Sequence, residues 1–257
     1  MTTTLWEHPS QHYLGSDGSR MQGDKRYVGA SPSWVIWQLL QRYTAAGETV
    51  LDPMVGSGTT LDVCRDLGRV GIGFDLAPSR SDIRQGDARR IDLPSASADF
   101  VFVDPPYSTH VDYSDDPACI GKLDALGESG GRGYYEAMGR VIREMARVLR
   151  PGRHLGLYVS DSFRKPGAGS TSTGFAPIGF ELFSMMTQVL QPVDIIAVVR
   201  HNSKLERGNW HKAAEEGNFF LRGFNYLFVM RKEPGNSGGA GGTRISAGTR
   251  GGRRAGG

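Results

Sequence analysis

One strand–loop–helix stretch constrains the fold of this chain more than any other. Residues 49–52 form a short apolar strand, residues 53–60 form a loop that contains Gly56 and Gly58, and a helix follows to about residue 67. These elements in this order open a nucleotide-binding βαβ unit, where glycines let the backbone approach a ligand and the helix N-terminus favours a negative group. No lysine follows Gly58, which excludes a P-loop. The pattern predicts an α/β fold with a parallel sheet.

Acidic side chains follow the next two strands of this predicted sheet. The strand over residues 70–75 ends in Asp75, 17 residues after Gly58, a spacing at which an acid can hold ribose hydroxyls. Asp87 ends a weaker strand and suits an adenine amine. In open α/β sheets ligands bind at the carboxyl ends of the strands. The acids and the glycine loop therefore predict an adenosine-type pocket at that edge.

A fourth apolar run, residues 100–103, ends in Asp104-Pro105-Pro106-Tyr107. Consecutive prolines have no N–H to give to a ladder, so strand pairing stops there. Asp104 and the carbonyl of Pro105 can each accept one N–H of an exocyclic amine, while Tyr107 stacks on the ring that carries the amine. The alternative is a plain proline turn, at which any carboxylate would serve.

The remaining pattern completes the α/β arrangement. A helix is predicted with Ser31 as N-cap and Pro32 at its first position, closed by Gly47. An amphipathic helix over 133–149, a strand over 154–159, a helix over 180–190 and strands over 193–199 and 224–230 follow. The intervening segments 108–132, 165–174 and 200–218 are predicted to be loops; the last is rich in basic and aromatic residues.

Composition points to an intracellular, soluble chain, expected in the cytoplasm. No apolar run approaches the ~18 residues needed to span a bilayer, and the N-terminus lacks the pattern of a signal peptide. Cys64 and Cys119 are too few for a disulfide framework or a zinc site, and Cys64 is expected to pack in the core. The net charge of +3 becomes −1 once the four arginines of residues 234–257 are set aside. That Gly- and Arg-rich tail is predicted to be disordered.

Three motifs together resemble those of S-adenosylmethionine-dependent DNA amino-methyltransferases, the DNA methylase N-4/N-6 family of the DPPY type. The carriers are residues 51–60, Gly73-Phe74-Asp75 and the proline motif at 104–107, and the resemblance covers about residues 27–232. It implies a Rossmann-like, seven-stranded class I methyltransferase sheet with helices on both faces and a β-hairpin at its end. The implied domains are an N-terminal extension over 1–26, a methyltransferase domain over 27–233 and the tail.

The resemblance also implies the cofactor, S-adenosyl-L-methionine, and the residues that hold it. Asp52 and the glycine loop would flank the methionine, Asp75 the ribose and Asp87 the adenine, and residues 27–34 would complete the methionine site. The implied cofactor-binding set is Asp52, Pro53, Gly56, Ser57, Gly58, Thr59, Asp75, Leu76, Asp87 and Ala88. The implied catalytic set is Asp104, Pro105, Pro106 and Tyr107. No metal is expected.

The implied reaction is methyl transfer to an exocyclic amino nitrogen of a base in DNA. A motif that begins with Asp favours adenine N6; the alternatives are cytosine N4 in DNA, or guanine N2 or adenine N6 in RNA. The target nitrogen is unreachable in a stacked duplex, so the base must flip out or be single-stranded. The sequence holds no large separate target-recognition domain, so recognition is expected from the loops 108–132, 162–176 and 200–218.

Two rival functions belong to other classes. One is a nucleotide-binding module without catalysis, against which the intact acceptor motif argues. The other is an oxidoreductase that binds a dinucleotide through the same βαβ unit, but the loop lacks the G-x-G-x-x-G spacing. The expected partner is therefore a nucleic acid, with DNA favoured over RNA, and not a membrane.

Overall fold

The computed structural model describes residues 1–8, 22–24, 27, 29–109, 111, 113–164, 174–199 and 208–234. Within these residues, eight strands form one sheet in the order β1-β9-β10-β6-β5-β2-β3-β4. The strands are β1 (Leu5–Trp6), β2 (Thr49–Asp52), β3 (Val70–Asp75), β4 (Arg84–Gln85), β5 (Ala98–Val103), β6 (Leu149–Val159), β9 (Gln191–Val199) and β10 (Phe224–Arg231).

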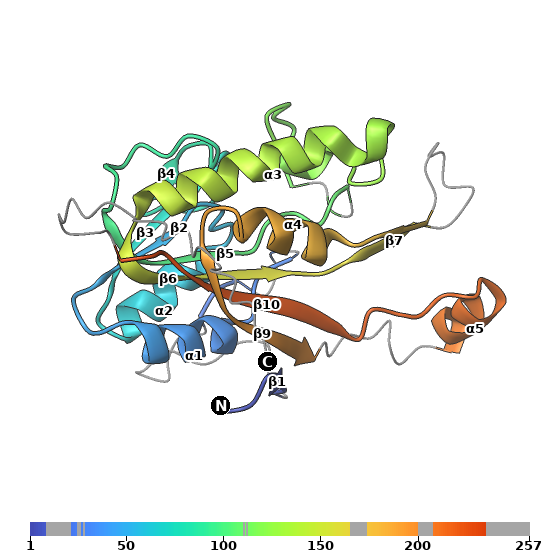
Figure 1. Ribbon diagram of the computed structural model, residues 1–257, viewed down its shortest axis with the longest axis horizontal. Helices are drawn as coiled ribbons and strands as arrows, with labels where there is room; N and C mark the ends of the chain where they lie inside the picture. The colour runs from blue at the N-terminus through green and yellow to red at the C-terminus, as the bar shows by residue number, and fades with distance from the viewer. Residues whose placement is uncertain are drawn as a thin grey trace, which may run out of the picture.

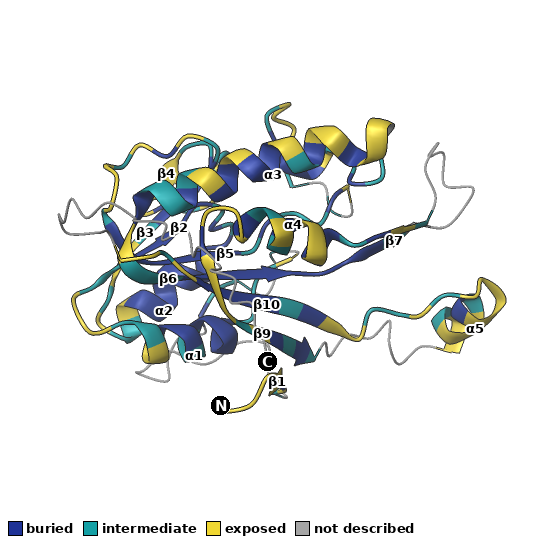
Figure 2. Ribbon diagram, viewed as in Figure 1, coloured by how far each residue is buried: buried dark blue, intermediate teal, exposed yellow. Residues whose placement is uncertain are grey.

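Helices cover both faces of the sheet (Figure 1). On one face lie α1 (Ser33–Tyr43) and α2 (Thr59–Asp66), and on the other lie α3 (Glu128–Val148) and α4 (Ile178–Met186). Each face has its own apolar cluster, because side chains alternate between the two sides of a strand. In β5, Phe100 and Phe102 pack toward α1, whereas Val101 and Val103 pack toward α3. Figure 2 shows the resulting buried centre of the sheet.

The sheet topology confirms the predicted Rossmann-like class I arrangement. Strands β2, β3, β4, β5 and β6 run parallel, and β10 pairs antiparallel with both β6 and β9. The antiparallel pair β9–β10 is the hairpin that the resemblance implies. The eighth strand, β1, was not predicted from the sequence, and it pairs parallel with β9 at the outer edge.

The predicted start and end of the first helix are wrong. Pro32 is extended and precedes the helix, which begins at Ser33, and the Ser31 hydroxyl donates to Asp104 instead of capping the helix. The helix ends at Tyr43 with Thr44 as C-cap. Gly47 lies beyond it, in the left-handed region at φ 80°, and its N–H donates to the carbonyl of Gly68.

The segments predicted as loops contain structure that the periodicity did not reveal. The 108–132 connection includes a short 3₁₀ helix, η1 (Ile120–Lys122). α3 is assigned from Glu128, but Ser129, Gly130 and Gly131 have left-handed φ, so its regular part agrees with the predicted helix over 133–149. The 200–218 connection includes α5 (Gly208–Glu216), which projects from the body in Figure 1. A two-stranded sheet, β7 (Ser162–Arg164) with β8 (Gly174–Ala176), flanks the 165–174 stretch. Residues 165–173, 200–207 and the tail 235–257 lie outside the described residues. In the described part, no helix is long and apolar enough to cross a membrane.

Trp6 is predicted to contribute more stability than its place in a two-residue strand suggests. Its side chain is 3% exposed, packs near Trp34 and donates from Nε1 to the carbonyl of Thr3 at 2.8 Å. Trp6→Ala should lower the free energy of unfolding by about 3 kcal/mol in a urea titration, the order for a truncated buried aromatic. Leu5→Ala is the control, because Leu5 is 62% exposed. Equal effects of the two substitutions would show that β1 is not a packed part of the fold.

Candidate functional site

A cavity of about 140 Å³ lies at the carboxyl ends of β2, β3 and β5. Most of the residues predicted for cofactor and acceptor binding line it. These are Asp52, Pro53, Gly56, Ser57, Thr59, Asp75, Leu76, Asp87, Ala88, Asp104 and Pro106. Three predicted residues, Gly58, Pro105 and Tyr107, are near it in sequence but do not line it. The structure thus brings the glycine loop and the acceptor motif to one cavity.

The glycine loop is tightly enclosed. Gly56 and Gly58 have φ of 51° and 84°, which side chains rarely adopt. A Cβ on Gly56 would lie 3.0 Å from the ring of Tyr27, and one on Gly58 would lie 2.5 Å from Arg80 Nη1. The Gly56 N–H donates to Asp75 Oδ2 at 3.1 Å. Neither glycine can therefore be replaced without moving the loop.

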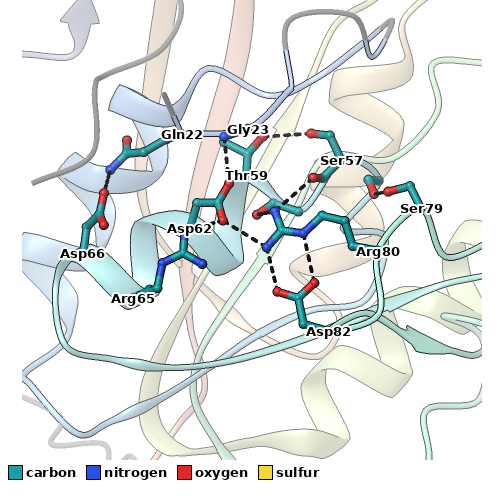
Figure 3. A network of polar contacts seen from close by, with 12 residues as sticks. Gln22, Gly23, Ser57, Thr59, Asp62, Arg65, Asp66, Ser79, Arg80 and Asp82 are labelled. Carbon is teal, nitrogen blue, oxygen red and sulfur yellow. Dashed lines mark hydrogen bonds and ion pairs between the residues drawn. The ribbon is translucent and has the colours of Figure 1, made fainter. Parts of the chain in front are cut away.

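Arg80 holds this loop from its outer side (Figure 3). Its Nη1 donates to the carbonyls of Ser57 and Gly58, both at 3.3 Å. Its other nitrogens pair with Asp82, at 2.6 and 2.9 Å, and with the buried Asp62 on α2, at 3.0 Å. Because Asp62 also accepts the backbone N–H of Gly23, one carboxylate connects the N-terminal segment, α2 and the glycine loop.

Asp52 is a buried carboxyl at the end of β2, 3% exposed. Its Oδ2 accepts the Thr60 hydroxyl at 2.5 Å and its Oδ1 accepts the Met54 N–H at 3.0 Å. Burial raises the pKa of Asp52 to about 7, although these two hydrogen bonds act in the opposite direction. A cationic group in the cavity would favour the ionised form.

Asp75 and Asp87 have different surroundings in the cavity wall. Asp75 accepts backbone N–H groups of Gly56 and Ala77, which leaves room on both oxygens for further donors. The Asp87 carboxylate instead accepts the backbone N–H, Nε and Nη2 of Arg89, at 2.6–3.0 Å. An adenine amine would therefore have to share Asp87 with Arg89, which the sequence did not indicate.

The acceptor motif is held by hydroxyl groups from distant parts of the chain. Asp104 Oδ2 accepts the Ser31 hydroxyl and Asp104 Oδ1 accepts the Tyr107 hydroxyl, each at 2.7 Å. The buried Tyr134 of α3 donates to the carbonyl of Pro106 at 2.8 Å. The proline turn is thereby fixed to α3, and the Asp104 carboxylate is oriented from both sides.

The cavity wall also includes residues outside the predicted cofactor-binding and catalytic sets. Tyr27 and Ser31 line it and lie in the 27–34 segment that was expected to complete the methionine site, whereas Tyr113 and Cys119 line it and were not predicted. Burial, with the charges of Asp75 and Asp104 nearby, raises the pKa of Tyr27 to about 12, so its hydroxyl stays protonated. The segments that contain these residues show no periodicity, and their position depends on tertiary contacts. Among the described residues, no group of His, Cys, Asp and Glu side chains could hold a metal ion.

Comparison with known proteins agrees with these motifs. Residues 2–85 match the DNA methylase family model. The resemblance to DNA methylases is confirmed over these residues. Over 73 residues the chain is 30% identical to the type II methyltransferase M.MjaII of Methanocaldococcus jannaschii, and over 74 residues 32% identical to the type II methyltransferase M.HpaI of Haemophilus parainfluenzae. These matches cover 28% and 29% of this chain, and 14% and 22% of the two relatives.

The DNA methylase match coincides with the N-terminal part of the fold, and solved structures extend the similarity of fold beyond it. The chain superposes on the [4+2]-cyclase SpnF with a TM-score of 0.50 and 18% identity, over 83% of this chain and 87% of that one. At this identity the similarity shows the fold alone. It supports the α/β fold over 83% of the chain.

Asp52 predicts a dependence of stability on pH. Its folded pKa of about 7 lies above the ordinary 3.8, so its contribution to stability is fully present below about pH 4 and is lost as the pH rises to 7. Asp52→Asn removes this titration. The free energy of unfolding of the variant should therefore rise relative to the wild type between pH 4 and pH 7, by at least about 1.4 kcal/mol, the equivalent of one pKa unit. Denaturant titrations at several pH values measure it, and parallel curves for the two proteins would contradict it.

Proposed function

We propose that this protein transfers a methyl group from S-adenosyl-L-methionine to an exocyclic amino nitrogen of a base in DNA, adenine N6 being the target. The observation that carries the proposal is the single cavity lined both by the glycine loop and by Asp104. A hydrogen-bond acceptor for an amine thus lies beside the strand ends at which nucleoside-type cofactors bind in open α/β sheets. The DNA methylase match over residues 2–85 supports the same reaction.

The residues of the cavity fit this cofactor. Asp52, Asp75 and Asp104 line the cavity together, and the glycine loop leaves no room for a Cβ at its turn. A cofactor that is positively charged at its sulfonium and amino groups suits such an acidic cavity. When bound, S-adenosylmethionine supplies an electrophilic methyl group. Asp52 and residues 53–59 would hold the methionine end, Asp75 and Leu76 would hold the ribose, and Asp87 and Ala88 would hold the adenine.

The acceptor motif acts on the amine. An exocyclic nitrogen conjugated to a purine ring is a poor nucleophile, because its lone pair is part of the ring π-system. Asp104 and the Pro105 carbonyl accept its two hydrogens, which draws the nitrogen toward sp³ geometry and stabilises the positive charge that develops on it. Pro106 fixes this turn through its bond to Tyr134, and the Tyr107 ring stacks on the base. The proton is lost after transfer, so Asp104 need not be a strong base.

The resemblance supports the adenine target, because in the family that it implies a motif that begins with Asp, as at Asp104, accompanies adenine N6 more often than cytosine N4. A carboxylate is a stronger acceptor than a hydroxyl for an amine that gains charge. Adenine N6 and cytosine N4 both present such an amine, and the base must leave its stack to reach Asp104. The amine of an RNA base would bind the same acceptor. Discrimination between DNA and RNA must therefore come from contacts outside the acceptor motif.

Asp75→Ala should weaken S-adenosylmethionine binding by about 1.5–3 kcal/mol, because charged hydrogen bonds to the ribose are lost. Isothermal calorimetry measures the dissociation constant. Asp92→Ala is the matched control, because Asp92 is an exposed carboxylate that does not line the cavity. If both variants bind like the wild type, Asp75 does not contact the cofactor.

Asp104→Ala should retain cofactor binding and lose turnover by about a hundredfold or more, the order for one lost transition-state contact. The assay transfers labelled methyl groups to DNA and, separately, to RNA, and the products are digested to nucleosides. Label in N6-methyl-2′-deoxyadenosine from the DNA sample supports the full proposal. Label in N4-methylcytosine, or only in the RNA sample, would correct the target and leave the role of Asp104 standing. Turnover near that of the wild type by the variant would contradict the mechanism.

A further inference from the structure

Asn225 is a buried amide near the start of β10. It is 4% exposed and pairs in register with Val198 of β9. Alternate residues of a strand share a face, and the next two on this face, Leu227 and Val229, belong to the apolar cluster under α1. An amide among such neighbours is less favourable than an apolar side chain unless its hydrogen bonds are made.

Only one end of this amide has a partner. Nδ2 of Asn225 donates to the hydroxyl oxygen of Tyr107 at 3.3 Å. Oδ1 is buried and has no hydrogen-bond partner among the described residues. A buried acceptor without a donor destabilises the fold, and such groups in native proteins call for a functional explanation. The contact with Tyr107 supplies one here, because Tyr107 is part of the acceptor motif.

The donor at Asn225 sets the direction of the next hydrogen bond. A tyrosine hydroxyl has one hydrogen to donate. Because Asn225 donates to the Tyr107 oxygen, that hydrogen points to Asp104 Oδ1, at 2.7 Å. On the other side, the Ser31 hydroxyl donates to Asp104 Oδ2. A directed chain thus runs from β10 through Tyr107 to the carboxylate at the end of β5.

We propose that Asn225 is a positioning residue, which orients the Tyr107 hydroxyl so that Asp104 is held as an acceptor in the geometry that receives the target amine. Its catalytic consequence rests on the proposed methyl transfer. Asn225 acts through Tyr107 and does not itself contact the base. The unpaired Oδ1 reflects a site in which the donor is needed and the acceptor is not.

Reversing the hydrogen bond should be worse than deleting it. Asn225→Asp offers an acceptor in place of the donor, so the Tyr107 hydrogen would turn toward residue 225 and leave Asp104 Oδ1 without its donor. Asn225→Leu keeps a similar volume and removes both polar atoms. Asn225→Ala also removes the donor. Because alanine is small, this variant shows whether any effect of Asn225→Leu comes from poor packing of the leucine.

The experiment is a double-mutant cycle between Asn225 and Tyr107. Variants Asn225→Leu, Asn225→Ala and Asn225→Asp are made in the wild type and in Tyr107→Phe, and kcat, KM and the melting temperature are measured. We expect Asn225→Leu to lower kcat about fivefold to tenfold, the effect of one neutral hydrogen bond, and to keep or raise the melting temperature. Asn225→Asp should lower kcat further. In the Tyr107→Phe background, Asn225→Leu should have no additional effect on kcat.

Tyr226→Phe is the matched control. Tyr226 is the next residue of β10, and its hydroxyl donates to Asp161 Oδ2 at 3.1 Å, away from Asp104. Its removal should leave kcat within about twofold of the wild type. Cofactor affinity, measured by calorimetry, should be the same in every Asn225 variant.

The possible outcomes separate this proposal from the proposed function. Additive losses of kcat in the cycle, or unchanged kcat in both Asn225→Leu and Asn225→Ala, would overturn the role of Asn225. If the wild type methylates neither DNA nor RNA, the proposed function fails. The melting temperatures of the variants then decide whether Asn225 and Tyr107 are coupled. Non-additive shifts for Asn225 and Tyr107 would then support the directed chain of hydrogen bonds, and additive shifts would overturn it.

Discussion

The rest of the structure depends on the burial of β5 on both faces. All six residues of this strand are buried, and its neighbours β2 and β6 are covered by helices from both sides. Apart from Asp99 near its start, which is paired with Arg150, the strand holds only apolar side chains, because burying an unpaired polar group is costly. Reactive and ligand-binding side chains therefore lie where the strands end. Asp52, Asp75 and Asp104 are each the last residue of a strand or the first one after it.

The charge of the cavity follows from this arrangement. Three carboxylates from three strand ends line the same cavity. Asp75 and Asp104, joined by Asp52 when it is ionised, create a negative potential that disfavours ligands rich in phosphate, such as dinucleotides, and favours ligands with positive charge. The negative potential argues against an oxidoreductase that binds a dinucleotide. This argument is independent of the absence of the G-x-G-x-x-G spacing in the loop. Arg80 does not cancel the potential, because its charge is paired with Asp62 and Asp82 outside the cavity.

The sequence predicted best the elements whose signals are local. The bounds of β2 and β3 agree with the prediction, because short apolar runs bounded by glycine and acid define them. The start of α1 was wrong because Ser31, a good N-cap in isolation, bonds to Asp104, 73 positions away. For the same reason Asn225, 118 positions from Tyr107, gave no signal as a site residue. β1 was missed because two residues carry no periodicity, and their strand exists only by pairing with β9.

The small strand β1 has a further consequence for how the molecule meets others of its kind. β9 forms one side of the hairpin, and its outer edge would present free backbone groups to any passing strand. β1 occupies that edge opposite Ala197 and Val198, and the Ala197 N–H donates to the carbonyl of Thr4. At the other end of β9, Pro192 has no N–H to offer and Asp194 adds a charge. One half of this edge is therefore blocked from pairing with another chain by β1, and the other half is blocked by Pro192 and the charge of Asp194. A hairpin whose exposed side chains include Val193 and Ile195 is in this way kept from serving as a template for aggregation.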